Sequence, residues 1–127
     1  MKLTSIYMAL LAVHLTHIIE ELAGKASFIQ WYGLTIYLFL EAAYFLFAVG
    51  TFMGLTKRSR IAYTLSYAYA AIMVMDGIFH ILRATYHRTY LGNGAGSFTA
   101  IILIFLGGAL FSKLLGKKQY LFTKHRR

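Results

Sequence analysis

The chain contains no cysteine, no proline and only four acidic residues among its 127 residues. Without cysteine, a disulfide framework, a zinc–thiolate site and an iron–sulfur cluster are excluded. Without proline, the helices lack the usual kink-forming residue, which weakly disfavours the broken-helix architecture of many transporters. Charged residues make up 13% of the chain, whereas an ordinary soluble domain carries roughly 25%. This composition argues against a soluble domain.

What the chain does contain is a series of long apolar runs. Its hydrophobic fraction is 59% and its mean hydropathy is +0.62. Four stretches, at 3–23, 30–55, 61–82 and 97–115, are long enough to cross a hydrocarbon core, which takes roughly 20 helical residues. The first run has no convincing small-residue cleavage site, so we expect a retained helix and not a signal peptide. The prediction is one all-α domain over residues 1–127, a four-transmembrane-helix bundle in the cell membrane.

The basic residues predict how this bundle is oriented. With the amino terminus inside, three basic residues fall on the outer side, namely Lys25, Arg83 and Arg88. Ten fall on the inner side: Lys2, Lys57, Arg58, Arg60, Lys113, Lys117, Lys118, Lys124, Arg126 and Arg127. Cytoplasmic flanks of membrane helices carry such an excess, so both termini and the basic tail at 116–127 are expected in the cytoplasm. The net charge of +9 then favours membrane lipids as contacts and gives no support for nucleic acid.

Ionisable residues interrupt three of the apolar runs at helical spacing. His14, His17 and Glu21 are separated by three and four residues and therefore share one helix face, with Glu20 beside them. In the third run, Asp76, His80, Arg83 and His87 follow one another at intervals of four, three and four residues. Glu41 lies close to the middle of the second run. At a rise of about 1.5 Å per residue, both stripes fall in the outer half of the predicted membrane.

The cost of burying charge predicts that these residues meet. A charged side chain near the centre of a bilayer costs roughly 2.5–3.5 kcal/mol even on the lenient insertion scale. Glu41 and Asp76 must therefore face the bundle interior, where they find partners, or be protonated. Because four helices enclose one interior, we expect the two stripes and Glu41 to share one pocket in the outer half.

Imidazole and carboxylate groups together are suited to zinc, iron or manganese, so the pocket is a candidate site for a divalent metal. The predicted ligands are His17, Glu20, Glu21, Asp76 and His80, with His14 and Glu41 as further candidates. The predicted catalytic residues are Glu20, Glu21, Asp76 and Arg83, the carboxylates as bases and the arginine for an anionic group. The alternative is a purely structural hydrogen-bond network among the same side chains.

Three short motifs resemble those of the HXXEE-motif family of small integral membrane proteins, whose function is uncharacterised. The His-x-x-Glu-Glu motif is intact as His17, Glu20 and Glu21. An Asn-x-x-x-His motif has its counterpart in Asp76 and His80, with Asp in place of Asn, and a Tyr-x-Pro-Gly-x-x-Thr motif survives only in residues 96–99. The resemblance covers most of the chain, implies a shared pocket and supplies no reaction.

Three functions are compatible with this pocket. The first is a membrane-embedded enzyme, metal-dependent or acid–base, acting on a lipid-like substrate such as an isoprenoid. The second is a binding or transport module for a proton, ion or small ligand, although the polar stripe does not extend into the inner half. The third is an accessory subunit of a larger membrane complex, or a homo-oligomer, in which the polar core fixes helix register. The sequence does not select among them.

Overall fold

The computed structural model describes residues 2–24, 29, 32–86 and 97–123. Four helices make up nearly all of this part: α1 (Leu3–Gly24), α3 (Leu34–Thr56), α4 (Arg60–Tyr86) and α5 (Ser97–Thr123). Each helix is long and apolar enough to cross a membrane. The predicted all-helical architecture with four such helices is confirmed, and it suggests a multi-pass membrane protein.

Three helix boundaries differ from those predicted. α3 begins at Leu34 and not at residue 30, because Gly33 before it has a φ of 86°, a left-handed conformation outside the helical range. α4 and α5 continue to Tyr86 and Thr123, beyond the predicted ends at 82 and 115. Apolar runs locate the part of a helix that is suited to lipid, whereas the backbone hydrogen bonds continue into the polar residues that follow.

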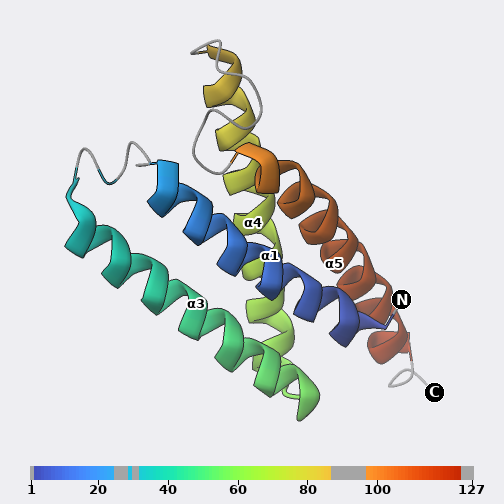
Figure 1. The fold of residues 1–127 in the computed structure, drawn as a ribbon. Helices are drawn as coiled ribbons and strands as arrows, with labels where there is room; N and C mark the ends of the chain where they lie inside the picture. The colour runs from blue at the N-terminus through green and yellow to red at the C-terminus, as the bar shows by residue number, and fades with distance from the viewer. Residues whose placement is uncertain (1, 25–28, 30–31, 87–96, 124–127) are drawn as a thin grey trace.

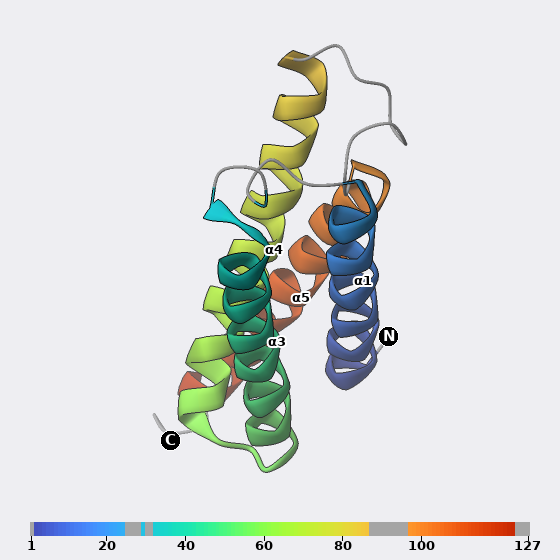
Figure 2. The same cartoon turned by 60° about the vertical axis from the view of Figure 1, so that its left-hand side comes forward.

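The helices form a ring in which neighbours in the chain run in opposite directions (Figures 1 and 2). α1 packs against α3 and α5, and α4 packs against the same two helices, so α1 and α4 lie diagonally across the bundle. Both ends of the described chain lie at the end of the bundle where α3 turns into α4. The C-terminal end of α1 and the N-terminal ends of α3 and α5 lie at the opposite end, which we call the upper end.

The lower half of the bundle holds the hydrophobic core. Tyr7, Leu10, Tyr69, Leu110 and Leu114 are fully buried there and belong to one cluster that all four helices supply. Most of the ionisable side chains of the spans lie in the upper half. Apolar packing thus dominates in the lower half, and polar contacts between helices are added to it in the upper half.

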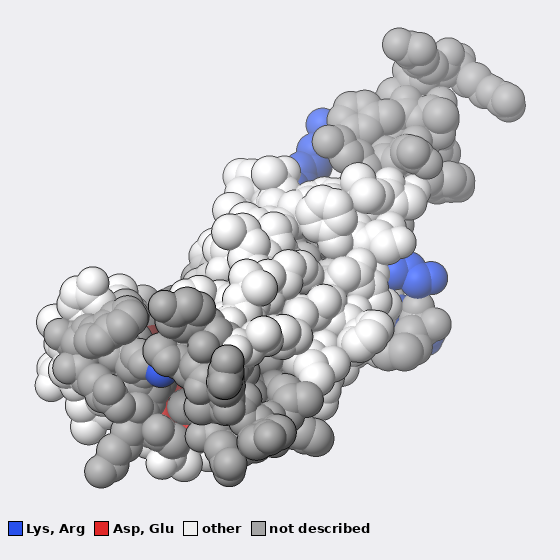
Figure 3. Space-filling view, turned by 90° about the horizontal axis from the view of Figure 1, so that it is seen from above, with Lys and Arg blue, Asp and Glu red and all other residues white. Residues whose placement is uncertain are grey.

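The outer surface of the bundle is apolar. Large hydrophobic side chains such as Phe39, Leu46 and Phe105 are 69–73% exposed. Seen from the upper end, the described surface is largely uncharged, and acidic atoms show only in small areas between others (Figure 3). An exposed apolar surface of this extent is far larger than soluble monomers tolerate and suits contact with lipid.

Two glycines on the inner face allow α4 and α5 to pack closely. A Cβ atom on Gly77 would lie 2.5 Å from the Ala100 carbonyl oxygen and 2.7 Å from Ile104 Cγ1, and one on Gly107 would lie 2.8 Å from Val74 Cγ2. The neighbouring Gly108 has no atom within 4 Å of its Cβ position. Gly77 and Gly107 therefore act within the bundle, as small residues do at membrane helix contacts.

These contacts predict opposite effects for the same substitution at two glycines. Gly77→Ala should destabilise the bundle by about 1–3 kcal/mol, because the α5 backbone cannot yield as a side chain would. Gly108→Ala should be neutral or stabilising by up to about 1 kcal/mol, since alanine favours helix. The measurement is reversible unfolding in micelles by circular dichroism. Equal effects of the two changes would contradict the described packing of α4 on α5.

Candidate metal centre

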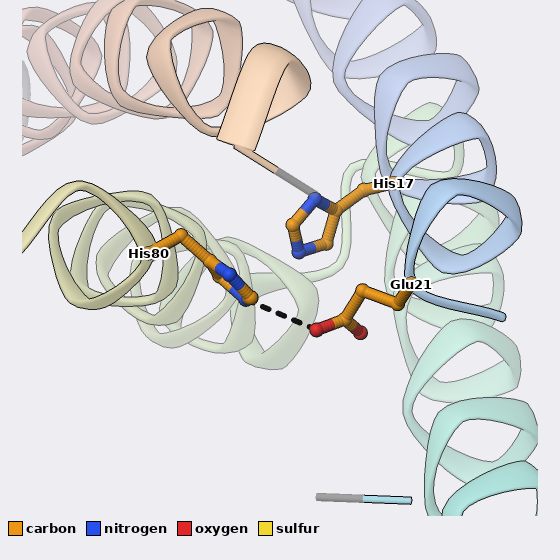
Figure 4. A group of neighbouring side chains, drawn as sticks. All are labelled: His17, Glu21 and His80. Carbon is orange, nitrogen blue, oxygen red and sulfur yellow. Dashed lines mark ion pairs between the residues drawn. The ribbon is translucent and has the colours of Figure 1, made fainter. Parts of the chain in front are cut away.

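Three buried side chains from α1 and α4 converge in the upper half of the bundle. His17 and Glu21 lie one turn apart on α1, and His80 reaches them from α4, diagonally opposite (Figure 4). One ligand atom from each lies within 4.8 Å of the other two. His80 Nε2 is 3.1 Å from Glu21 Oε1, and the two imidazole rings meet edge to face with centroids 4.7 Å apart. The group has the residue types and spacing that a divalent ion requires.

The Asp76 carboxylate adjoins both imidazoles of this group. Its Oδ2 atom is 3.1 Å from His17 Nε2, and its Oδ1 atom is 3.6 Å from His80 Nε2. Asp76 lies one turn before His80 on the same face of α4, so its place follows from the helical repeat. Two carboxylates and two imidazoles thus surround one point between the diagonal helices.

A chain of hydrogen bonds from α5 orients the His17 ring. The Thr99 hydroxyl donates to Glu20 Oε2 at 2.8 Å, and Thr99 Oγ1 is 2.7 Å from His17 Nδ1. A hydroxyl has one proton to give, so the Nδ1–H of His17 must donate to Thr99. The Glu20 carboxylate also accepts from the Thr99 backbone N–H at 3.4 Å, near the first turn of α5, where a negative charge is favourable.

This orientation determines what His17 Nε2 can do. With its proton on Nδ1, a neutral imidazole presents a lone pair at Nε2. That atom is buried, and Asp76 Oδ2 lies 3.1 Å from it, but a carboxylate has no proton to donate to an unprotonated Nε2. A buried polar atom without a hydrogen bond requires an explanation. Either a second proton or a cation satisfies Nε2, and an imidazole held by its other nitrogen is the usual arrangement of a metal ligand.

Glu21 is oriented in a similar way by α3. The Tyr37 hydroxyl donates to Glu21 Oε2 at 2.7 Å, which leaves Oε1 directed toward His80. Tyr37 and Glu21 are both buried. His17 and Glu21, the two candidate ligands on α1, thus each have a hydrogen-bond partner on another helix.

A second pair lies deeper in the bundle. His14 Nε2 is 3.6 Å from Glu41 Oε2, and His14 Nδ1 is 3.2 Å from the Tyr69 hydroxyl. His14 is buried, whereas about a quarter of the Glu41 side chain, 27%, is exposed. The pair is separate from the three-residue group but shares a cavity with it.

Two adjoining cavities connect these groups. One of about 190 Å³ is lined by Glu21, Tyr37, Leu40, Glu41, Asp76, Phe79 and His80. The other, of about 140 Å³, is lined by His14, His17, Glu41, Tyr44, Ile72, Met73 and Asp76. Glu41 and Asp76 line both, so the two cavities meet at a pair of carboxylates between α1, α3 and α4.

The structure brings most of the predicted site residues together, with two exceptions. Glu20 lies beside Glu21 in sequence but points to α5, where it holds Thr99. Arg83 is half-buried one turn beyond His80 and lines neither cavity. Its role toward an anionic group stays a prediction, as does metal ligation by the others. His87, at the end of the predicted stripe, lies outside the described residues.

Two residues that hydrogen-bond the site, Tyr37 and Thr99, were given no role when the site was predicted from the sequence. Tyr37 is four residues before Glu41 and therefore on the same face of α3, a spacing that signals a shared site. Thr99 was part of the third motif, and the structure gives that motif a physical connection to the first through His17 and Glu20. The second motif joins them through Asp76 and His80.

Comparison of the chain with protein-family profiles, with curated proteins and with solved structures finds no match. The resemblance to the HXXEE-motif family is therefore not tested by these comparisons, and the chemistry of the site has to be argued from its residues.

The hydrogen bond from His17 to Thr99 predicts a pair of metal affinities. Thr99→Val removes the hydroxyl at nearly constant volume and should weaken zinc binding by about 10–100-fold, the usual cost of losing a partner behind a metal-bound histidine. Thr99→Ser keeps the hydroxyl and should bind zinc nearly as the wild type does. Competition with a chromogenic chelator in micelles measures both. Equal affinities for Thr99→Val and the wild type would show that this hydrogen bond does not prepare His17 for a metal.

Proposed function

We propose that the protein is a multi-pass membrane protein that holds a divalent metal ion between α1 and α4. His17, Glu21 and His80 are the ligands, and Asp76 is placed to complete the set. The observation that carries this proposal is that ligand atoms of three buried side chains, His17, Glu21 and His80, lie within 4.8 Å of one another. The HXXEE-like motifs contribute these same side chains. Zinc, iron and manganese all suit two imidazoles and two carboxylates.

Charge balance supports a cation at this site. Among the residues that the structure describes, all four ion pairs join a histidine to a carboxylate, and none involves lysine or arginine. With neutral imidazoles, Glu21 and Asp76 leave two negative charges close together in a medium of low dielectric, an arrangement that is costly without compensation. One divalent ion neutralises both and satisfies His17 Nε2 at once.

The membrane location and orientation rest on the helices and on the basic flanks. All four helices have the length and hydropathy of membrane spans, and their exposed side chains are apolar. The excess of lysine and arginine near the lower end supports an orientation with both termini in the cytoplasm. The metal group then lies in the outer half of the bilayer, as the positions of His17 and His80 along their helices require.

With a metal ion held at this depth in the membrane, the protein is a metal-dependent enzyme acting on a lipid-like substrate. A metal ion in such a site polarises a bound oxygen or activates water, while Glu41, which lines both cavities, is available as a base. Glu41 lies on α3, outside the group of ligands, and its contact with His14 holds it at the cavity wall. A site at this depth meets substrates that reside in the membrane.

A transport function is less well supported by the structure. A transport path requires polar groups on both sides of the site, and the described lower half is filled by the hydrophobic cluster around Tyr7, Leu10 and Leu110. Hydroxyl groups occur there, but Tyr7 and Ser66 donate to backbone carbonyl oxygens of Ala48 and Ala62. The arrangement favours a site that is accessible from one side.

Elemental analysis of two glutamine variants at adjacent positions tests the metal proposal. Wild-type protein purified without added metal should contain about one divalent ion per chain, since a preformed ligand set binds tightly. Glu21→Gln and His80→Ala should lose it, because each removes a ligand. Glu20→Gln, the matched control one residue away, should retain metal with reduced affinity. A wild type without stoichiometric metal, or equal loss from Glu20→Gln and Glu21→Gln, would refute the proposed ligand set.

A further inference from the structure

The exposed residues that line the two cavities all belong to α3 and α4, so the cavities open to the surface between these helices, at a place that we call the gap. These helices touch at the lower end, where a Cβ atom on Gly54 would lie 2.6 Å from the Ala62 Cβ, and they diverge toward the upper end (Figure 1). The residues that line the cavities on this side are Leu40 from α3 and Ile72 and Phe79 from α4, which are 43–55% exposed. The gap therefore has an apolar rim on the lipid-facing surface.

Behind this rim, the cavity wall is acidic. The side chains of Glu41 and Asp76 are 27% and 33% exposed, and both line the two cavities. At membrane depth, a carboxylate exposed to hydrocarbon would cost several kcal/mol. A polar occupant that donates hydrogen bonds to these carboxylates from the gap would lower this cost.

We propose that an amphiphile with a hydrogen-bond-donating polar end, a primary amine, enters the site sideways from the membrane between α3 and α4. The proposal deepens the proposed function and takes from it the location of the site in the membrane. The apolar rim accommodates the hydrocarbon tail, and Glu41 accepts the hydrogen bonds of the polar end. With Glu21 and Asp76 balanced by the metal, Glu41 provides the remaining negative charge.

Size and charge restrict the class of ligand. Cavities of about 190 and 140 Å³ fall below the roughly 300–1,000 Å³ of pockets that enclose a drug-sized ligand. Only a small polar end fits inside, while the tail remains in the gap. Among the residues that the structure describes, neither lysine nor arginine lines either cavity, so an anionic end such as a carboxylate meets three acidic side chains without a described cationic partner. An amine is complementary to this wall.

The test uses photoactivatable ligands and protein reconstituted in lipid nanodiscs. A long-chain primary amine with a diazirine in its tail is compared with the carboxylic acid of the same length, and the labelled residues are located by mass spectrometry. The amine should label Leu40, Ile72 and Phe79 in preference to Phe105, an exposed residue of α5. Glu41→Gln should reduce this labelling about tenfold, as loss of a hydrogen bond to a charged group would.

Two neighbouring tryptophan substitutions serve as a matched pair. Leu40→Trp narrows the gap and should suppress labelling, whereas Phe39→Trp, at a residue that is 73% exposed and lines neither cavity, should not. Equal labelling by the acid and the amine, or labelling spread evenly over the lipid-facing residues, would overturn the inference. Metal content measured on the same samples separates the two proposals. If the metal content is normal but the labelling is unselective, only the proposed entry of the amine is rejected. If the labelling is selective but the protein holds no metal, only the proposed metal site is rejected.

Discussion

The arrangement of the upper half of the bundle depends on one constraint, the cost of placing charge in a medium of low dielectric. Four acidic residues and three histidines interrupt helices whose other side chains are mostly apolar, and none of them can be left without a partner. In the structure, Glu21, Glu41 and Asp76 each lie within ion-pair distance of an imidazole, and Glu20 accepts from Thr99. The contacts of Asp76 and His80 with His17 and Glu21 join α1 to α4 across the diagonal of the ring in the upper half, as the stacked rings of Tyr7 and Tyr69 do in the lower half.

The division of the bundle into two halves follows from the same constraint. The lower half is closed by packed apolar side chains around Tyr7 and Leu110. In the upper half, polar side chains and two cavities near the gap between α3 and α4 occupy part of the interior. Sites of function are commonly built at such local departures from good packing, and the surrounding structure supplies the stability.

The four helices and most of the residues that meet at the site could be predicted from the sequence, because helical periodicity is a strong signal. The spacing of His14, His17 and Glu21, and that of Asp76 and His80, placed each set on one face, and the cost of burial required the faces to meet. The direction of Glu20 could not be predicted in this way. Adjacent helical residues point about 100° apart, so two neighbouring carboxylates cannot serve one site equally, and which of them faces α4 depends on the rotation of α1. The partners Tyr37 and Thr99 depend on contacts between helices, which no spacing within one helix specifies.

X-ray absorption at the metal edge of the purified protein reports the ligands of the ion itself and is therefore the sharpest test of a metal site between α1 and α4. We expect imidazole nitrogen and carboxylate oxygen scatterers at about 2.0–2.2 Å, with two histidines contributing. The imidazole contribution should fall by half in His80→Ala supplied with excess metal. A first shell made of oxygen alone, or a spectrum that His80→Ala leaves unchanged, would contradict a metal site between α1 and α4.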